Sequence, residues 1–255
     1  MPHSSEVLHD LIALSRSLGD PSRDLAILGE GNTSALVDAD SFMIKASGKE
    51  LRTADVSSFV SVSLSRALSV LDETELTDAE VRQALLDCKS DPTGESMPSV
   101  ETFLHAYLLS LPDINFIGHT HPTAVNAVLC SANAKKAVSG RLFPDEIVCC
   151  GPAVCYVEYI DPGLPLARHL RKRVEEFIDE HNMSPKVILM ENHGFIACGK
   201  TTRDVETITA MYVKTARILL RTYAMGGPRF LTPENVARIH TRPDEHYRQR
   251  QIGGR

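Results

Sequence analysis

The stretch INFIGHTHPTAVNAVLC, residues 114–130, decides how this chain is expected to fold. Its first five residues are mostly apolar and predict a short strand that runs directly into His119-Thr120-His121. From residue 122 the apolar residues follow helical spacing, which predicts a helix over residues 122–130. Alternate residues of a strand point to the same face, so His119 and His121 are expected to project side by side where the strand ends.

Strand and helix patterns also alternate along the rest of the chain, and several strands are joined by tight turns. Strands are predicted over residues 34–37, 42–45, 59–64, 114–118, 146–160 with a turn at Gly151-Pro152, 186–190 and 195–198. Helices are predicted over residues 5–18, 77–88, 164–181 and 201–225, and from residue 98 to a stop at Pro112. This order indicates an α/β chain of the α+β type, with a central mixed or antiparallel sheet flanked by helices.

No linker, internal repeat or low-complexity segment divides the 255 residues. That length is within the range of one large α/β domain. A single domain is therefore predicted over residues 1–255, with residues 226–255 as a polar C-terminal tail.

Charge and hydropathy argue against two classes of partner. The chain has 27 Lys and Arg residues and 33 Asp and Glu residues, a formal net charge of −6. The only basic cluster, residues 168–173, is predicted to be a solvated helix face, so a nucleic-acid partner is not expected. No run approaches the roughly 18 consecutive apolar residues of a membrane span, so no membrane association is expected either.

Two observations predict a cytoplasmic location. The first twenty residues lack the basic stretch and apolar core of a secretory signal. The six cysteines are thinly scattered and include no C-x-x-C spacing, which is typical of free, largely buried thiols in a reducing compartment.

Three histidines and one glutamate are the candidate metal ligands. The His119 and His121 imidazoles are spaced as a divalent transition metal requires of two ligands. His193 also follows a buried strand, and Gly194 after it permits a sharp turn. Glu101, on the helix before the His-x-His strand, adds a carboxylate. Such a set leaves coordination positions for a substrate, although a single histidine is more often a surface or core residue than a ligand.

Four segments carry a resemblance to a known family. They are GEGNTS at residues 29–34, IKASG at 44–48, PSVE at 98–101 with His105, and GHTHP at 118–122 followed by ENHG at 191–194 and Gly199. In this order and spacing the sequence resembles the class II aldolase/adducin family over roughly residues 6–221. Its members include fuculose-phosphate and rhamnulose-phosphate aldolases and ribulose-phosphate 4-epimerase, and the resemblance implies their three-layer fold.

The resemblance implies that His119, His121 and His193 bind Zn²⁺, with Mn²⁺ or Co²⁺ as other possible metals. Glu101 would share the metal at rest and act as acid and base during turnover. The implied enzyme is a zinc-dependent aldolase that cleaves a ketose phosphate or related hydroxyketone. The reaction would pass through a metal-stabilised enediolate to dihydroxyacetone phosphate, or an analogue, and an aldehyde.

Three other functions stay open. A sugar-phosphate 4-epimerase or a 3-oxo-acid decarboxylase would use the same metal site, although Glu at position 101 resembles the aldolases and the epimerase has Asp there. A non-catalytic interaction module, like the adducin head, would keep the fold without the metal.

The implied phosphate-binding residues are Asn32, Ser47, Gly48 and Ser99. Lys45 could add positive charge, but a lysine before a tight turn is as often solvated. Gly29 and Val100 stand where fuculose-phosphate aldolase has hydroxyl residues, so two hydroxyl donors are missing. An uncharged or carboxylated sugar derivative is therefore the alternative to a sugar phosphate.

The resemblance also implies a homotetramer with sites at subunit interfaces, and a tail tyrosine that reaches a neighbouring subunit. Tyr247 is the candidate for that catalytic tyrosine, and the alternative is an ordinary tail residue. A second tyrosine of fuculose-phosphate aldolase has no counterpart, because this region reads RLFPDE at residues 141–146. Arg141 or Asp145 would line the pocket instead, although Asp after Pro is also an ordinary turn residue.

Overall fold

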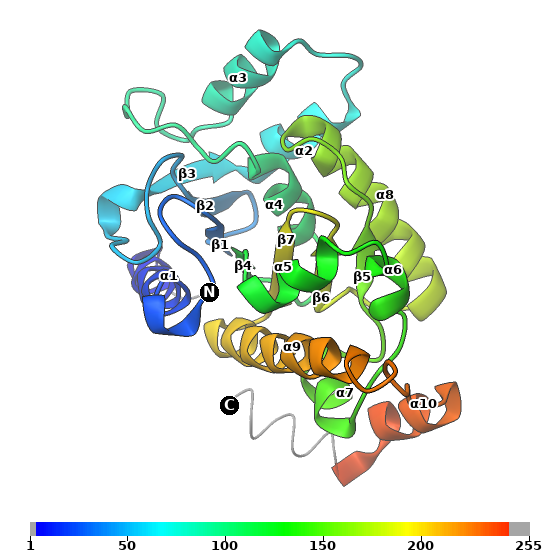
Figure 1. The fold of residues 1–255 in the computed structure, drawn as a ribbon. Helices are drawn as coiled ribbons and strands as arrows, with labels where there is room; N and C mark the ends of the chain where they lie inside the picture. The colour runs from blue at the N-terminus through cyan, green and yellow to red at the C-terminus, as the bar shows by residue number, and fades with distance from the viewer. Residues whose placement is uncertain (1–3, 245–255) are drawn as a thin grey trace.

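A computed structural model describes residues 4–244 and places a seven-stranded sheet at the centre of the molecule (Figure 1). The strands follow the order β3-β2-β1-β4-β7-β6-β5. They are β1 Asn32–Leu36, β2 Ser41–Lys45, β3 Phe59–Ser63, β4 Phe116–Thr120, β5 Cys155–Val157, β6 Val187–Met190 and β7 Gly194–Gly199. Neighbouring strands are antiparallel except β5 and β6, which are parallel, so the predicted mixed sheet is confirmed.

Helices cover both faces of this sheet. They are α1 Ser4–Leu18, α2 Leu64–Asp72, α3 Asp78–Asp87, α4 Thr102–Leu109, α5 Thr123–Leu129, α6 Ala134–Ala137, α7 Pro144–Cys150, α8 Leu164–His181, α9 Thr202–Tyr223 and α10 Pro233–Thr241. Two short 3₁₀ helices, Pro21–Arg23 and Val56–Ser58, lie in loops. Figure 1 shows α2 and α8 on one side of the sheet and α1 and α9 on the other.

The alternation of side chains along β6 and β7 explains why there are three layers. Ile188 and Ile196 point into a core shared with α2, α4 and α8, whereas Leu189 and Phe195 point into a second core shared with α5, α7 and α9. These central strands are apolar on both faces, so each face needs a helical layer to exclude water. The α/β fold and its three layers agree with the sequence-based expectation.

Capping boxes open two of the helices that were predicted from the sequence. Thr77 and Glu80 form a capping box at the start of α3, and Thr201 and Asp204 form another at the start of α9. In each box the threonine hydroxyl accepts a backbone N–H that the first turn leaves without a helical partner. Both signals are visible in sequence because they span only four residues.

The predicted strand over residues 146–160 is wrong in its first third, which forms helix α7. The run from Ile147 to Cys150 is buried, and an apolar run without polar interruptions has no periodicity that separates a buried strand from a buried helix. The helix signals were Pro144 at the first position, followed by Asp145 and Glu146 in the first turn. Only β5 remains as a strand in this region.

The predicted helix from residue 98 begins later than expected. Helix α4 starts at Thr102, Pro98 instead pairs with Ala46 in a β-bridge, and Glu101 occupies the N-cap position. Val100, which lies inside the predicted helix, precedes α4 and is 53% exposed. Every residue of α4 is buried, so its sequence lacks the polar face that would mark where the helix begins.

Three further helices, α2, α6 and α10, were not predicted from the sequence. Ser63, predicted to be inside a strand, ends β3 and caps α2. Helix α10 lies within the predicted tail of residues 226–255 and packs beside α7. The basic cluster is only partly solvated, because the Arg168 side chain donates hydrogen bonds to carbonyls at the end of α2, among them Leu71 O at 3.2 Å.

Membrane-spanning helices and disulfides are both absent from the described part of the chain. No helix between residues 4 and 244 is both long and apolar enough to cross a membrane. Within the same residues no disulfide is formed, and five of the six cysteines are buried, as predicted.

Candidate metal centre

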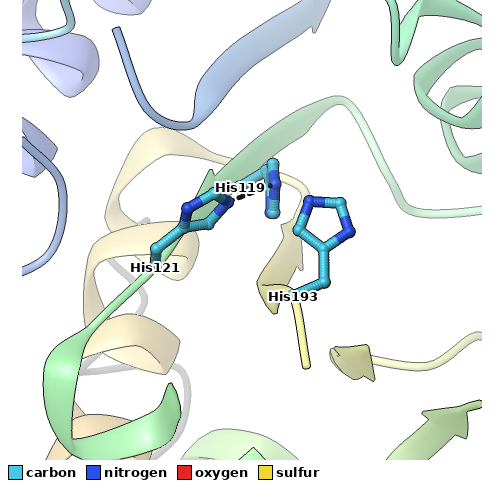
Figure 2. Close-up of side chains that lie close together, drawn as sticks. All are labelled: His119, His121 and His193. Carbon is cyan, nitrogen blue, oxygen red and sulfur yellow. Dashed lines mark hydrogen bonds between the residues drawn. The ribbon is translucent and has the colours of Figure 1, made fainter. Parts of the chain in front are cut away.

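Three histidine side chains meet where β4 ends and β7 begins (Figure 2). His119 is on β4, His121 lies just beyond it, and His193 lies in the tight turn between β6 and β7. Each offers one ring nitrogen, and these nitrogens all lie within 4.8 Å of one another. The ring centroids are 4.8 to 5.3 Å apart. The structure thus brings together the three predicted imidazoles, and their role as metal ligands stays a prediction.

The close approach of the rings depends on Gly194. A Cβ atom at this position would lie 2.6 Å from Cδ2 of His121 and 2.9 Å from Cε1 of His119. It would also lie 2.9 Å from the backbone oxygen of Thr120, which cannot move aside independently of β4. Only glycine therefore lets the β6–β7 turn pass this close to the two imidazoles.

One hydrogen bond fixes the orientation and tautomer of His119. Its Nδ1 lies 3.1 Å from the carbonyl oxygen of Phe195, and because a carbonyl only accepts, Nδ1 carries the proton. The lone pair of the neutral ring is then on Nε2, which lies 3.1 Å from Nε2 of His121. Burial lowers the pKa of both His119 and His121 to about 4, so both rings are neutral near pH 7.

Glu101 completes the cluster as a buried carboxylate, 5% exposed. Its two oxygens lie 3.4 Å from Nε2 of His119 and 3.2 Å from Nε2 of His193. Burial would by itself raise the pKa of Glu101, but His119, His193 and a hydrogen bond from Asn32 outweigh burial and lower it. The side chain is therefore an anion at neutral pH, in position to add an oxygen donor to the three nitrogens.

The donor set fits a divalent transition metal. Imidazole nitrogens with one carboxylate oxygen are ligands that such ions accept. Among residues 4–244, Oε1 of Glu101 and Nδ1 of His193 are buried atoms without a hydrogen-bond partner. A cation at the centre of the cluster would satisfy the carboxylate oxygen, which is costly to bury alone.

Glu30 is a site residue that the sequence analysis quoted within a motif without assigning it a role. Its Oε1 lies 3.7 Å from Nδ1 of His121, on the side of the ring away from His119. The His121 backbone N–H donates to the carbonyl of Leu25 at 2.8 Å, so the loop of residues 24–31 holds both the backbone and the ring of this histidine. The feature of the sequence that could have identified Glu30 is its position two residues before β1.

Glu30→Gln is expected to weaken zinc binding about tenfold. Carboxylates that face the far nitrogen of a ligand histidine orient the ring and raise its basicity, with effects of about 10 to 100-fold on metal affinity. The lower end applies because the Glu30 side chain is 39% exposed. Competition with a chromophoric chelator measures the affinity, and equal affinity in wild type and variant would refute a role for this carboxylate.

The predicted phosphate-binding residues fall into two groups. Asn32 and Ser99 are buried, and the Asn32 amide nitrogen donates to Ser99 Oγ at 3.2 Å and to Glu101 Oε2 at 2.6 Å. Ser47 and Gly48 lie in an exposed turn after β2, where Gly48 has a φ of +76° and the Ser47 N–H donates to Met97 O at 2.9 Å. Whether these residues bind phosphate stays a prediction.

Lys45 is buried, not solvated. It is 2% exposed, and its ammonium group donates to the backbone oxygens of Gly29, at 3.4 Å, and Lys49. Burial lowers the pKa of Lys45, and the nearby charge of Glu101 opposes that shift. The side chain therefore places a cation between two of the loops that the sequence analysis assigned to the substrate anion.

The remaining candidates lie elsewhere or outside the described residues. Arg141 is 2% exposed, pairs with Glu146 at 3.3 Å and donates to Gly151 O at 2.9 Å, so its guanidinium group is bound within the α7 region. Asp145 is in the first turn of α7 and is partly buried. Tyr247 lies outside residues 4–244, so its role as the tail tyrosine stays a prediction.

The apoprotein is expected to lose stability as the pH falls from about 6.5 to about 4. Burial lowers the pKa of His105, His119 and His121 to about 4, whereas an unfolded chain takes up these protons near pH 6.5. Protons therefore favour the unfolded chain in this window, by up to roughly 1.4 kcal/mol per pH unit for each histidine. Urea unfolding in the presence of a chelator measures the effect, and His105→Asn should reduce the slope. A midpoint that does not change across the window would contradict it.

The comparison with known families finds one match over most of the chain. The family described as Class II Aldolase and Adducin N-terminal domain matches residues 9–220. An uncharacterized oxidoreductase of Bacillus subtilis, YuxG, is 26% identical over 217 residues, which are 82% of this chain and only 29% of that protein. The chain thus spans less than a third of the length of this relative.

A second relative is similar over almost its whole length. The 3-oxo-tetronate 4-phosphate decarboxylase of Haemophilus influenzae is 22% identical over 235 residues, 91% of this chain and 95% of that protein. Among solved structures, an L-fuculose 1-phosphate aldolase superposes with a TM-score of 0.66 and 20% identity, covering 92% of this chain and 95% of the other. The structural likeness supports the fold.

Proposed function

Because this chain belongs to the class II aldolase and adducin N-terminal domain family, we propose that it is a metal-dependent lyase of the aldolase type. Its substrate would be a ketose phosphate or a related hydroxyketone, and its products dihydroxyacetone phosphate, or an analogue, and an aldehyde. The observation that carries the proposal is the buried Glu101 carboxylate, which lies within 3.4 Å of two of three clustered imidazoles. A structural role alone would not require a buried anion at such a cluster.

The residues that would hold the metal are His119, His121 and His193, with Glu101 in the resting state. When bound, Zn²⁺ would supply Lewis-acid stabilisation of the negative charge that develops on the substrate, and Mn²⁺ or Co²⁺ would supply the same chemistry. The Phe195 carbonyl supports this assignment, because it fixes His119 in the tautomer that offers Nε2.

Glu101 would carry the proton that is exchanged at the reacting carbon. In the cleavage direction the hydroxyl group that becomes the aldehyde oxygen loses its proton, and the electrons of the broken carbon–carbon bond remain on the ketone fragment as an enediolate. Glu101, which has first taken up a proton from solvent, gives that proton to the carbon and becomes a carboxylate again. In the reverse direction the carboxylate removes the same proton. A carboxylate becomes more basic when it is shielded from water and moves away from positive charge, which suits proton transfer near neutral pH. Tyr247 is the group that we propose takes up the proton of the hydroxyl group that becomes the aldehyde oxygen.

A small anionic substrate is the proposed partner. The buried ammonium group of Lys45 lies between the loop of Gly29 and the turn that carries Ser47 and Gly48. A cation with 2% exposure and carbonyl partners would gain from an anion at the loop surface. We extend the proposal to a homotetramer in the cytoplasm. Scattering that reports a stable, active monomer would refute the tetramer.

A decarboxylase is the second candidate, and one observation favours it. The relative from Haemophilus influenzae, which matches over 95% of its length, is a 3-oxo-tetronate 4-phosphate decarboxylase. Loss of carbon dioxide from a 3-oxo acid leaves an electron pair on the carbon next to the ketone carbonyl. Carbon–carbon cleavage of a hydroxyketone leaves an electron pair at the corresponding carbon. The same clustered residues would therefore serve either reaction.

Three measurements test the proposal. Elemental analysis of the purified protein should find one metal ion per chain, and the zinc-loaded protein should exchange a carbon-bound proton of dihydroxyacetone phosphate for deuterium in D₂O. Incubation with ketose phosphates and with phosphorylated 3-oxo acids, followed by product identification, separates aldolase from decarboxylase. A protein that purifies without metal and stays inert after zinc addition would instead be a non-catalytic, adducin-like module.

A further inference from the structure

The turn that carries His193 is held by helix α5. The side-chain amide nitrogen of Asn126, in the middle of α5, donates to the backbone oxygen of His193 at 3.1 Å. The backbone N–H of Asn192 donates to the carbonyl oxygen of Leu129, the last residue of the same helix, at 3.3 Å. Helix α5 therefore contacts two consecutive residues of the turn, and Asn126 makes the contact at the candidate metal ligand.

Helix α5 also continues directly from the segment that carries the other two histidines. It starts at Thr123, two residues after His121, and the Asn126 backbone N–H donates to Pro122 O at 2.9 Å in its first turn. Helical hydrogen bonds fix the backbone geometry of this segment. Asn126 is therefore at a set distance from His121, and its bond to His193 links two parts of the cluster that are distant in sequence.

The ring of His193 is held less directly than the other two rings. Nδ1 of His119 donates to a backbone carbonyl at 3.1 Å, and Nδ1 of His121 faces Glu30 at 3.7 Å. Nδ1 of His193, in contrast, is a buried atom with no hydrogen-bond partner in the described part of the chain. Its Nε2 lies 3.2 Å from Oε1 of Glu101, inside the cluster. The position of this ring therefore depends chiefly on the backbone that carries it.

The backbone of the turn has a conformation that its surroundings must hold. Only residues 191–193 separate β6 from β7, and Asn192 has a φ of +51°, in the left-handed region. Residues other than glycine adopt this region less readily, and such conformations persist where neighbouring contacts over-determine them. Loss of the bond from Asn126 would remove one of these contacts, so we expect the turn to relax and the His193 ring to move with it.

We propose that Asn126 is a positioning residue for His193, and that its amide holds the turn so that this imidazole meets those of His119 and His121. The proposal rests on the proposed function, in which His193 is a metal ligand. Asn126 acts through the backbone of His193, so its loss should weaken metal binding while all four candidate ligands remain in the chain.

Two substitutions and one control test this role. Asn126→Ala removes the amide, and Asn126→Leu keeps nearly the same shape without a donor. Both should weaken zinc binding about tenfold in competition with a chromophoric chelator, the lower end of the effect of groups that orient metal ligands. Both should also shift the visible absorption bands of the cobalt-loaded protein, which report ligand geometry. Asn115→Ala removes a similar bond, from an amide to Lys200 O at 3.3 Å, just before β4 and at the opposite end of that strand from His119. This control should bind zinc and cobalt as the wild type does.

Two results would overturn the proposal. One is a zinc affinity and a cobalt spectrum that stay at wild type in the folded Asn126 variants, and the other is an equal loss of zinc affinity in Asn115→Ala. If the wild type bound no zinc, the proposed function would fail separately, and crystal structures of the metal-free wild type and Asn126→Leu would decide the role of Asn126. A His193 Nε2 displaced from Glu101 in the variant would support that role, and an unchanged distance would refute it. If Asn126→Ala did not fold, Asn126→Leu would carry the test.

Discussion

Glu101→Gln is expected to slow deuterium exchange into dihydroxyacetone phosphate by about 1,000-fold, within the usual range for loss of a general base. An amide at this position keeps the shape of the side chain. Its oxygen can still accept the hydrogen bond from Asn32, which is 2.6 Å long in the wild type. The amide cannot act as a base, however, so the proton on the reacting carbon is not removed. Proton NMR of the substrate in D₂O measures the rate directly.

A control variant distinguishes the loss of the proton-transferring group from the loss of one negative charge. Glu175→Gln removes one negative charge from α8, where the Glu175 carboxylate pairs with Arg171 at 3.0 Å on the protein surface. This variant should exchange deuterium at the wild-type rate. Both variants should keep the circular dichroism spectrum and the thermal midpoint of the wild type to within a few degrees. An exchange rate for Glu101→Gln within tenfold of wild type would show that another group moves the proton.

Local patterns in the sequence identified the three histidines as candidates one segment at a time. His119 and His121 are separated by one residue, which is the spacing of side chains on one face of a strand. His193 comes shortly after the four apolar residues of β6, all of which are buried. Both segments end at the same edge because β4 and β7 are antiparallel neighbours. The sequence alone did not show that pairing, and the family resemblance brought the two segments together.

The contacts of Asn32, Lys45 and Glu30 could not be predicted, because each depends on partners distant in sequence. Asn32 reaches Glu101 across 69 positions through the register of β1 with β4. Glu30 reaches His121 because the loop before β1 folds back, with positive φ at Leu28 and at Gly31. Glycine often signals such a turn, but leucine does not, so the loop geometry is absent from the local pattern.

Dependence on tertiary packing also explains the errors at α4 and α7. Helices α4 and α7 are buried along most or all of their length, and a helix without a polar face has no period that a reader of the sequence can detect. Helix α8, in contrast, has a polar face and was placed correctly at Leu164–His181. The sequence-based assignment therefore failed in two segments where packing replaces amphipathic patterning.

Gly194→Ala is expected to weaken zinc binding about 100-fold or more while all four candidate ligands remain in the chain. The added methyl group would lie 2.6 Å from the ring of His121, 2.9 Å from the ring of His119 and 2.9 Å from Thr120 O. Because the backbone oxygen is fixed by the sheet, the two rings must move. Ligand geometry tolerates errors of only about 0.5 Å, so their nitrogens would no longer converge. Chelator competition and elemental analysis measure the loss.

Two comparisons make this result specific to the metal. Gly29→Ala adds the same methyl group where no atom lies within 4 Å, and its zinc affinity and thermal midpoint should match the wild type. His193→Ala removes one ligand without a clash and should also lose zinc, so agreement between it and Gly194→Ala would indicate a shared cause. If Gly194→Ala folds and binds zinc as tightly as the wild type, the rings do not hold the metal in the arrangement described. The close approach of the β6–β7 turn to β4 would then serve packing alone.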